Sequence, residues 1–298
     1  MIYEIKNEYL QAKINTFGAE LFSLIHLNGN YECIWQGDEK YWNGHSPILF
    51  PFCGRLFEEK YQYQGKIYQM PIHGFASQKE FTLLEKKNDE IYFQLSEDED
   101  TLQHYPFKFR LIVGYKLVQE KLIFSFKVIN DNDYPMYFSL GGHPAFNCPI
   151  NGVGNFDDYY VEFTNHSLLQ RIFSKNVLYT GEKKEYPLQD RKLSLNHHLF
   201  DFDAIFFELK NHQETLLLKT DLSESYIKME INKMNTVGFW HTNRTEAPFI
   251  CMEPSLGFPG REGIIENLET LLDVEKIESK QEYQNSYFVI VHIEKRML

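Results

Sequence analysis

Alternation of apolar and polar residues is the feature that most constrains the fold of this chain. In the segment KLIFSFKVI, residues 121–129, every second position is apolar: Leu122, Phe124, Phe126 and Val128. Successive side chains of a β-strand point to opposite faces, so these four residues lie on one face and the lysines and serine between them on the other. The pattern predicts an antiparallel strand with one buried face.

The same alternation recurs along the chain and predicts an all-β protein. Residues 216–231 predict a hairpin closed by 221–225, with Ile227, Met229 and Ile231 on its apolar face. Further strands are expected at 3–7, 10–14, 19–26, 91–95, 109–117, 158–163, 204–209 and 287–294. This spacing is typical of a mostly antiparallel β-sandwich with very little helix. Residues 100–107 and 266–274 are the candidates for short helices.

No change in composition divides the chain, so we expect one domain over residues 1–298. A formal net charge of -12 argues against nucleic acid or an anionic membrane as the main partner, because both would repel the average surface. The four cysteines form no CxxC pair, which argues against a zinc knuckle or a disulfide framework. Without a membrane-length apolar run or a signal-like start, the sequence predicts a cytoplasmic protein.

His143 is the first candidate functional residue, because it stands in the segment YFSLGGHPAFN where an apolar strand breaks at two glycines. Most histidines are structural or lie on the surface, so His143 alone does not define a site. Glu253 is the second candidate. It follows the apolar run PFICM and precedes a proline, an unusual place for a solvated carboxylate, and a partly buried glutamate with a raised pKa is a competent base.

Three further stretches carry polar residues beside glycine, proline or a strand end. Arg55 lies in FPFCGRLF, His73 in MPIHGFAS, and Asp201 and Asp203 in DFDAIFFEL. Trp240, in VGFWHTN, is a candidate for stacking on a sugar, although a core position explains it equally well. Taken singly, each of these residues is at least as well explained by an ordinary surface or structural role.

Together, three of the motifs resemble a known family. GGHPAFN, HGFA and EPSLGFPG, in one order and at wide spacing, are similar to the aldose 1-epimerase (galactose mutarotase) family and most closely to its LacX-like branch. The resemblance covers essentially the whole chain. It implies a β-supersandwich with a cleft on a large concave sheet, and interconversion of the α and β anomers of a free sugar without cofactor or metal.

The resemblance also implies roles for individual residues. In the family the histidine of the HP motif is the general acid and the glutamate before proline the general base, which correspond to His143 and Glu253. The substrate-binding arginine, the histidine of the HG motif and an aspartate before a strand correspond to Arg55, His73 and, more loosely, Asp203. The chemistry needs such a pair, since mutarotation removes the proton from O1 while it delivers one to the ring oxygen.

Departures from the family pattern leave the substrate open. The glycine that galactose-specific members carry after HG is replaced by Phe75, and the arginine that hexose 6-phosphate epimerases carry after HGFA is replaced by Ser77. We therefore expect a neutral sugar of the glucose or galactose type. A hexose 6-phosphate is the alternative substrate, and a non-catalytic sugar-binding or regulatory protein of the same fold is the alternative class.

Overall fold

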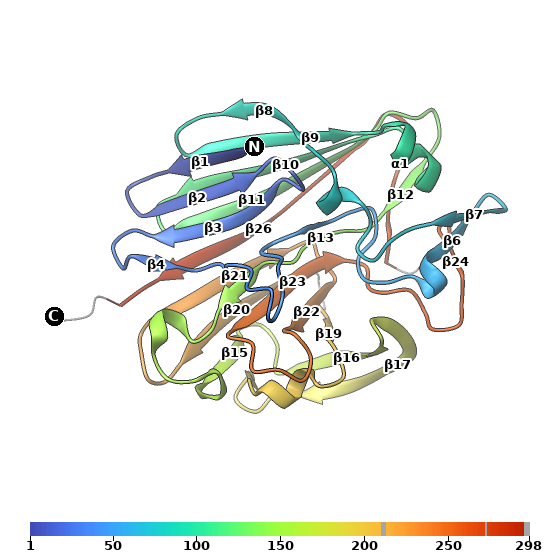
Figure 1. The fold of residues 1–298 in the computed structure, drawn as a ribbon. Helices are drawn as coiled ribbons and strands as arrows, with labels where there is room; N and C mark the ends of the chain where they lie inside the picture. The colour runs from blue at the N-terminus through green and yellow to red at the C-terminus, as the bar shows by residue number, and fades with distance from the viewer. Residues whose placement is uncertain (210–212, 272, 295–298) are drawn as a thin grey trace.

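The computed structural model describes residues 1–209, 213–271 and 273–294, and its largest element is a nine-stranded antiparallel sheet (Figure 1). The strands run in the order β18-β15-β20-β21-β26-β11-β10-β9-β8. Their bounds in chain order are β8 Thr82–Lys86, β9 Glu90–Ser96, β10 Phe109–Val118, β11 Lys121–Asn130, β15 Tyr159–Phe163, β18 Lys192–Ser194, β20 Gln213–Thr220, β21 Tyr226–Asn232 and β26 Glu282–His292. In β11 every second residue is buried, so the predicted alternation is confirmed.

A second sheet of eight strands carries the candidate site. Its order is β17-β16-β19-β22-β23-β13-β5, and β14 also pairs with β23. Its strands are β5 Ile48–Leu49, β13 Leu140–Gly142, β14 Ala145–Asn147, β16 Leu168–Lys175, β17 Leu178–Pro187, β19 Ile205–Glu208, β22 Thr236–Trp240 and β23 Phe249–Leu256. All eight residues of β23 are buried, so this strand lies in the interior of the protein.

The N-terminal residues form a four-stranded sheet that packs on the nine-stranded one. It consists of β1 Ile2–Lys6, β2 Leu10–Asn15, β3 Glu20–His26 and β4 Tyr31–Glu32. The Tyr115 hydroxyl of β10 donates to the Ala19 carbonyl at 2.6 Å, and the rings of Tyr3 and Phe93 lie 6.0 Å apart. Two small sheets complete the strands: β6 Lys60–Tyr63 with β7 Lys66–Gln69 and β24 Glu266–Asn267, and β12 Met136–Phe138 with β25 Glu275–Ile277.

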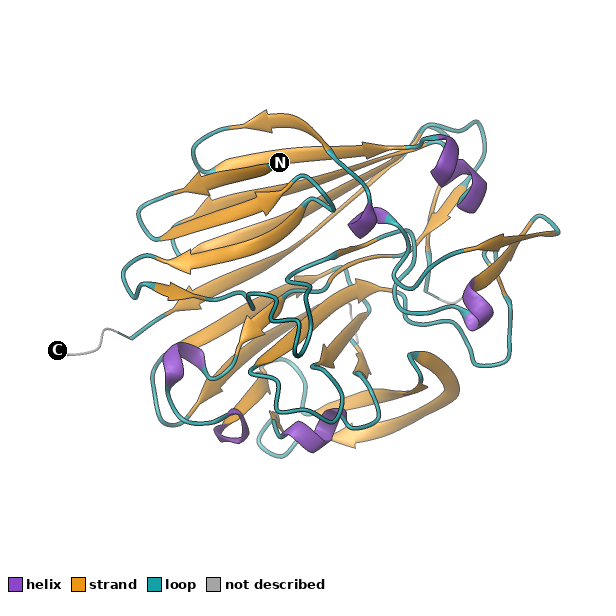
Figure 2. Ribbon diagram, in the orientation of Figure 1, coloured by secondary structure: helices purple, strands orange, loops and turns teal. Residues whose placement is uncertain are grey.

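Helices are few and short (Figure 2). The helix expected near residues 100–107 is α1, Glu99–His104, whose start is fixed by a capping box between Asp98 and Thr101. The 3-10 turns are η1 Phe57–Glu59, η2 Ala76–Gln78, η3 Ile150–Gly152, η4 Phe156–Asp158 and η5 His197–Phe200. Among the described residues no helix has the length and apolarity needed to cross a membrane.

The helix expected at 266–274 is wrong, since the described residues there form strand β24 followed by turns. Glu266 accepts from the backbone N–H of Arg261 and from its guanidinium at 2.8 Å, and the strand pairs in parallel with β6, some 200 residues earlier. Tertiary partners therefore override the local helical pattern. The strand predictions and the 216–231 hairpin, with its turn between Thr220 and Tyr226, are confirmed.

Candidate active site

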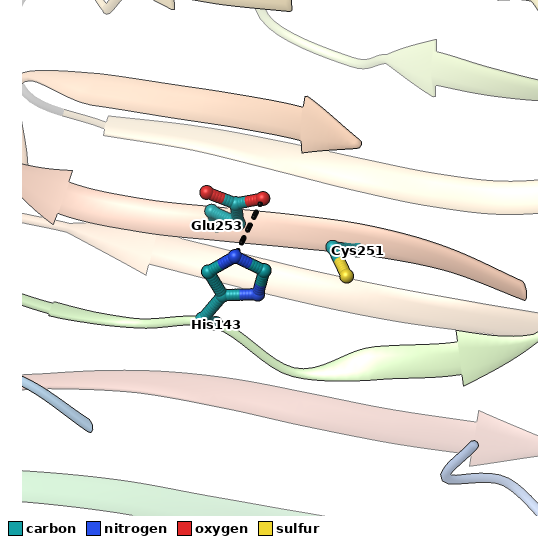
Figure 3. Close-up of side chains that lie close together, drawn as sticks. All are labelled: His143, Cys251 and Glu253. Atoms are coloured by element: carbon teal, nitrogen blue, oxygen red, sulfur yellow. Dashed lines mark ion pairs between the residues drawn. The ribbon is translucent and has the colours of Figure 1, made fainter. Parts of the chain in front are cut away.

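Glu253 and His143 are brought together by the pairing around β23. Strand β13 pairs with one end of β23 through Gly141 and Ser255, and β14 pairs with the other through Ala145 and Cys251. The link between β13 and β14 therefore passes over Glu253, and it carries His143 (Figure 3). His143 Nε2 lies 3.3 Å from Glu253 Oε1.

Space for the Glu253 carboxyl is provided by a glycine on the neighbouring strand. Gly238 of β22 is the partner of Glu253 in the sheet register. A Cβ on Gly238 would lie 3.1 Å from Glu253 Oε2 and 3.0 Å from the Phe206 ring, so a side chain there would crowd both neighbours.

Burial controls the protonation of this pair. The exposed fractions of His143 and Glu253 are 7% and 4%. Desolvation raises the pKa of Glu253 to about 8, with a further rise from the nearby charge of Asp203, and desolvation lowers the pKa of His143 to about 4. At pH values between about 4 and about 8, the two side chains together hold one proton. A pair in which one group acts as acid and the other as base needs one proton.

His73 contributes a neutral hydrogen-bond donor beside His143. Its Nδ1 accepts from the backbone N–H of Gly54 at 3.1 Å, so the neutral ring carries its proton on Nε2. Burial, with smaller contributions from His143 and Arg55, lowers the pKa of His73 to about 3. The rings of His73 and His143 meet edge to face with their centroids 5.4 Å apart.

The backbone that presents His73 is tightly constrained. His73 has a φ of +65°, which is unusual for a residue with a side chain, and the following Gly74 has a φ of +77°. A Cβ on Gly74 would lie 2.2 Å from the carbonyl oxygen of Phe50. The glycine of the HG pair is therefore required for the loop to approach Phe50 this closely.

Asp203, rather than Asp201, faces the same pocket. Asp203 lines it and accepts the Ala204 N–H at 2.8 Å, and burial raises the pKa of this carboxyl. Asp201 instead bonds His198 Nδ1 at 3.1 Å and lies among the residues of neighbouring hollows. The structure thus separates two aspartates that the sequence left as alternatives.

Aromatic rings form the wall of the pocket, which has a volume of about 330 Å³. Trp240 lines the pocket, and its Nε1–H donates to Asn243 Oδ1 at 3.0 Å. Trp42, which sequence reasoning missed, lies on the His143 ring at a centroid distance of 5.3 Å and against Trp240 at 5.5 Å. The complete lining is Trp42, Pro47, Ile72, His73, His143, Val177, Asp203, Ala204, Phe206, Trp240 and Glu253.

Like Asp201, Arg55 lies outside this lining. Its side chain is 37% exposed and its Nη1 lies 3.4 Å from Glu59 Oε1. Its positive charge nevertheless acts on the pocket, because it lowers the pKa of His73 and opposes the rise in the pKa of Asp203. Arg55 therefore influences the pocket by its charge without lining it.

Cys251 is a second residue that the sequence did not indicate. It stands two positions before Glu253 on β23, on the same face of the strand (Figure 3). Within the described part of the chain, His143, Cys251 and Glu253 are the one set of three potential metal ligands, with ligand atoms within 4.8 Å of one another. Burial raises the pKa of the Cys251 thiol well above its usual value, which disfavours the thiolate that metal binding needs.

Taken together, these features place a buried imidazole and a buried carboxyl 3.3 Å apart in an aromatic-lined pocket on an all-β scaffold, and these are the groups that acid and base catalysis uses. Comparison with known proteins gives the family: residues 1–266 match the model described as aldose 1-epimerase. The chain belongs to the aldose 1-epimerase family. Both the resemblance noted in the sequence and the expected fold class are confirmed.

Individual relatives agree with this assignment. The chromosomal LacX protein of Lactococcus lactis subsp. lactis is 32% identical over 267 residues, covering 86% of this chain and 88% of the relative. A solved galactose mutarotase related enzyme from Lactobacillus acidophilus is 30% identical with a TM-score of 0.95, covering 98% of each chain. A galactose mutarotase-like protein from Lactobacillus casei is 31% identical with a TM-score of 0.91, covering 98% of this chain and all of that one.

Proposed function

We propose that this protein is an aldose 1-epimerase that interconverts the α and β anomers of free aldohexoses. The observation that supports this most directly is the buried 3.3 Å contact between His143 and Glu253 inside a pocket of about 330 Å³. Glu253 takes the proton from the O1 hydroxyl while His143 delivers one to the ring oxygen, and the ring opens to the aldehyde. Rotation about C1–C2 followed by the reverse transfers closes the other anomer.

The proton count of the pair suits this cycle. A carboxylate with an imidazolium, and a carboxylic acid with a neutral imidazole, are two tautomers of the same one-proton pair. The two side chains lie 3.3 Å apart, so a small reorientation on sugar binding aligns them for this transfer and gives the ionised form. Raising the pKa of Glu253 to about 8 also makes its carboxylate a stronger base than an ordinary glutamate.

The other pocket residues are assigned to substrate binding in this proposal. His73 donates its Nε2–H to a sugar oxygen, and Asp203 accepts from a sugar hydroxyl. Trp240 and Trp42 offer ring faces to the apolar C–H face of the sugar. Arg55 supports Asp203 by charge from the margin rather than by lining the pocket.

We expect neutral sugars to be preferred to their 6-phosphates. Within residues 1–209, 213–271 and 273–294, the lining of the pocket contains no lysine or arginine. Lys79, the basic residue that follows the HGFA motif and Ser77, forms ion pairs with Asp98 at 3.0 Å and Asp100 at 2.7 Å. A phosphate dianion inside this lining would therefore have no lysine or arginine side chain beside it to compensate its desolvation.

Polarimetry with freshly dissolved α-glucose, α-galactose and glucose 6-phosphate tests the proposal. We expect catalysed mutarotation of the two neutral sugars, and loss of about 10²- to 10⁴-fold in rate for Glu253→Gln and for His143→Asn. Cys251→Ala is the matched control, since it changes a buried side chain on the same strand face outside the proposed proton transfers.

Sugar binding without any catalysed mutarotation would instead favour the non-catalytic alternative. A tenfold preference for the phosphate in kcat/KM, about 1.4 kcal/mol, would contradict the substrate assignment.

A further inference from the structure

Phe202 is the most exposed large apolar side chain in the described part of the molecule, with 85% of its surface accessible. It stands between Asp201 and Asp203, so it is directly adjacent in sequence to a residue of the proposed sugar pocket. An exposed phenylalanine contributes little to the core, and its ring face is accessible to a bound molecule.

The segment that carries Phe202 is held by hydrogen bonds rather than left loose. The Asp201 N–H donates to the His198 carbonyl and the Asp203 N–H to the Phe200 carbonyl, both at 3.2 Å. Arg244 Nε donates to the Asp201 carbonyl at 3.3 Å. Asp203 also has a φ of +109°, a strained value for a residue with a side chain. The turn therefore directs Asp203 into the pocket while Phe202 stays in solvent.

Phe202 lines two hollows of the surface. One has a volume of about 540 Å³ and is lined by Phe202 and Asp203. Asp203 also lines the sugar pocket. The other, on the side of His197, is also lined by Phe202. Because Asp203 lines both, the first hollow borders the place where the first sugar would bind.

The chemistry of the first hollow suits a second sugar ring. Beside the Phe202 ring it presents the hydroxyl of Ser174, the amides of Asn176 and Asn243, and the guanidinium of Arg244. One apolar face surrounded by hydrogen-bonding groups matches a pyranose, which has an apolar C–H face and hydroxyls at its edge. Asn243 also receives the Trp240 N–H, so the hollow and the pocket wall are joined through a hydrogen bond.

We infer that Phe202 forms a subsite for the second ring of a reducing disaccharide, whose reducing ring occupies the pocket of His143 and Glu253. This inference rests on the proposed function, because that function places the free C1 hydroxyl beside the acid and base. The second ring must then be attached through another hydroxyl and leave through the pocket opening. The hollow at Phe202 is where it meets an aromatic face.

Calorimetric binding of glucose and maltose tests the subsite without depending on turnover. The reducing ring is glucose in both sugars, so they differ only in the second ring. Wild-type protein should bind maltose more tightly than glucose, and Phe202→Ala should weaken maltose about tenfold, about 1.4 kcal/mol, while glucose changes less than about twofold. Phe202→Tyr, which keeps the ring, should retain the preference.

Phe17→Ala is the matched control, because Phe17 is also an exposed phenylalanine but lies outside the pocket and both hollows. Equal binding of the two sugars by wild type, or an equal effect of Phe202→Ala on both, would overturn the subsite. Parallel polarimetry separates the two proposals. Phe202-dependent maltose binding without mutarotation contradicts the enzyme and supports the subsite, whereas glucose mutarotation without that binding supports the enzyme and refutes the subsite.

Discussion

Replacing Glu253 by glutamine should stabilise the folded protein at alkaline pH while removing its proposed activity. Burial raises the pKa of Glu253 from 4.5 to about 8. The folded state therefore binds this proton more tightly than the unfolded chain does, and stability falls as the pH rises through that interval. The interval corresponds to roughly 4 to 5 kcal/mol, at about 1.36 kcal/mol for each pKa unit.

Glutamine avoids this loss because its amide does not ionise. A buried amide that lacks a full set of hydrogen bonds costs about 1 to 3 kcal/mol, so the net gain at about pH 9 is roughly 1 to 4 kcal/mol. At about pH 5 the wild-type carboxyl is still protonated in the fold, and the ionisation penalty is below about 1 kcal/mol. The difference between Glu253→Gln and wild type should therefore grow by roughly 3 to 4 kcal/mol between these two pH values.

Urea unfolding of both proteins at about pH 5 and about pH 9 measures this difference from midpoints and slopes. Glu90→Gln is the control, since ion pairs with Lys116 and Lys87 lower the pKa of Glu90. The ion pairs of Glu90 stabilise the fold fully at any pH above about 4.5, the usual pKa of a glutamate. The loss of unfolding free energy in Glu90→Gln should therefore be similar at both pH values. If the effect of Glu253→Gln is equally independent of pH, Glu253 is not a desolvated carboxyl and the proposed base loses its physical support.

Three further outcomes follow from the site. The pH profile of kcat/KM should have limbs near the pKa values of about 4 and about 8 set by His143 and Glu253, and a profile without the alkaline limb would contradict the shared proton. Gly74→Ala should cost more than about 2 kcal/mol in thermal or urea unfolding, whereas Gly65→Ala, with the same φ of +77° but nothing within 4 Å, should cost only about 1. His73→Leu should lower kcat/KM for glucose at least tenfold through the lost donor, and unchanged kinetics would remove His73 from the site.

Local sequence patterns were sufficient for most of the fold. The alternation in 121–129 and the hairpin at 216–231 each predicted a strand whose buried face the structure reproduces, because strand periodicity depends on neighbours in the chain. The region 266–274 shows the limit. Its strand depends on pairing with β6 and on the bonds between Glu266 and Arg261, and neither partner is visible in the local pattern.

The same distinction applies to the site. Glu253 and His143 were found through unusual local surroundings and a family resemblance, yet their contact depends on β13 and β14 pairing with β23 more than 100 residues away. Trp42 was missed because nothing in its own segment indicates a position on the His143 ring. The inward aspartate was ambiguous for a related reason, since the φ of +109° that turns Asp203 toward the pocket depends on the folded turn.

Several features that destabilise the fold lie in the pocket, and this is a further reason to place the function there. His143 Nδ1 and Glu253 Oε1 are buried without a hydrogen-bond partner among the described residues, and the 3.3 Å contact of the pair lacks hydrogen-bond geometry. His73 and Asp203 both adopt strained backbone angles, and burial disfavours the charged form of all four groups. A fold selected for stability alone would satisfy or replace such groups. A sugar has hydroxyls that can donate to Glu253 and Asp203 and accept from His73, so sugar binding would provide these groups with hydrogen-bond partners.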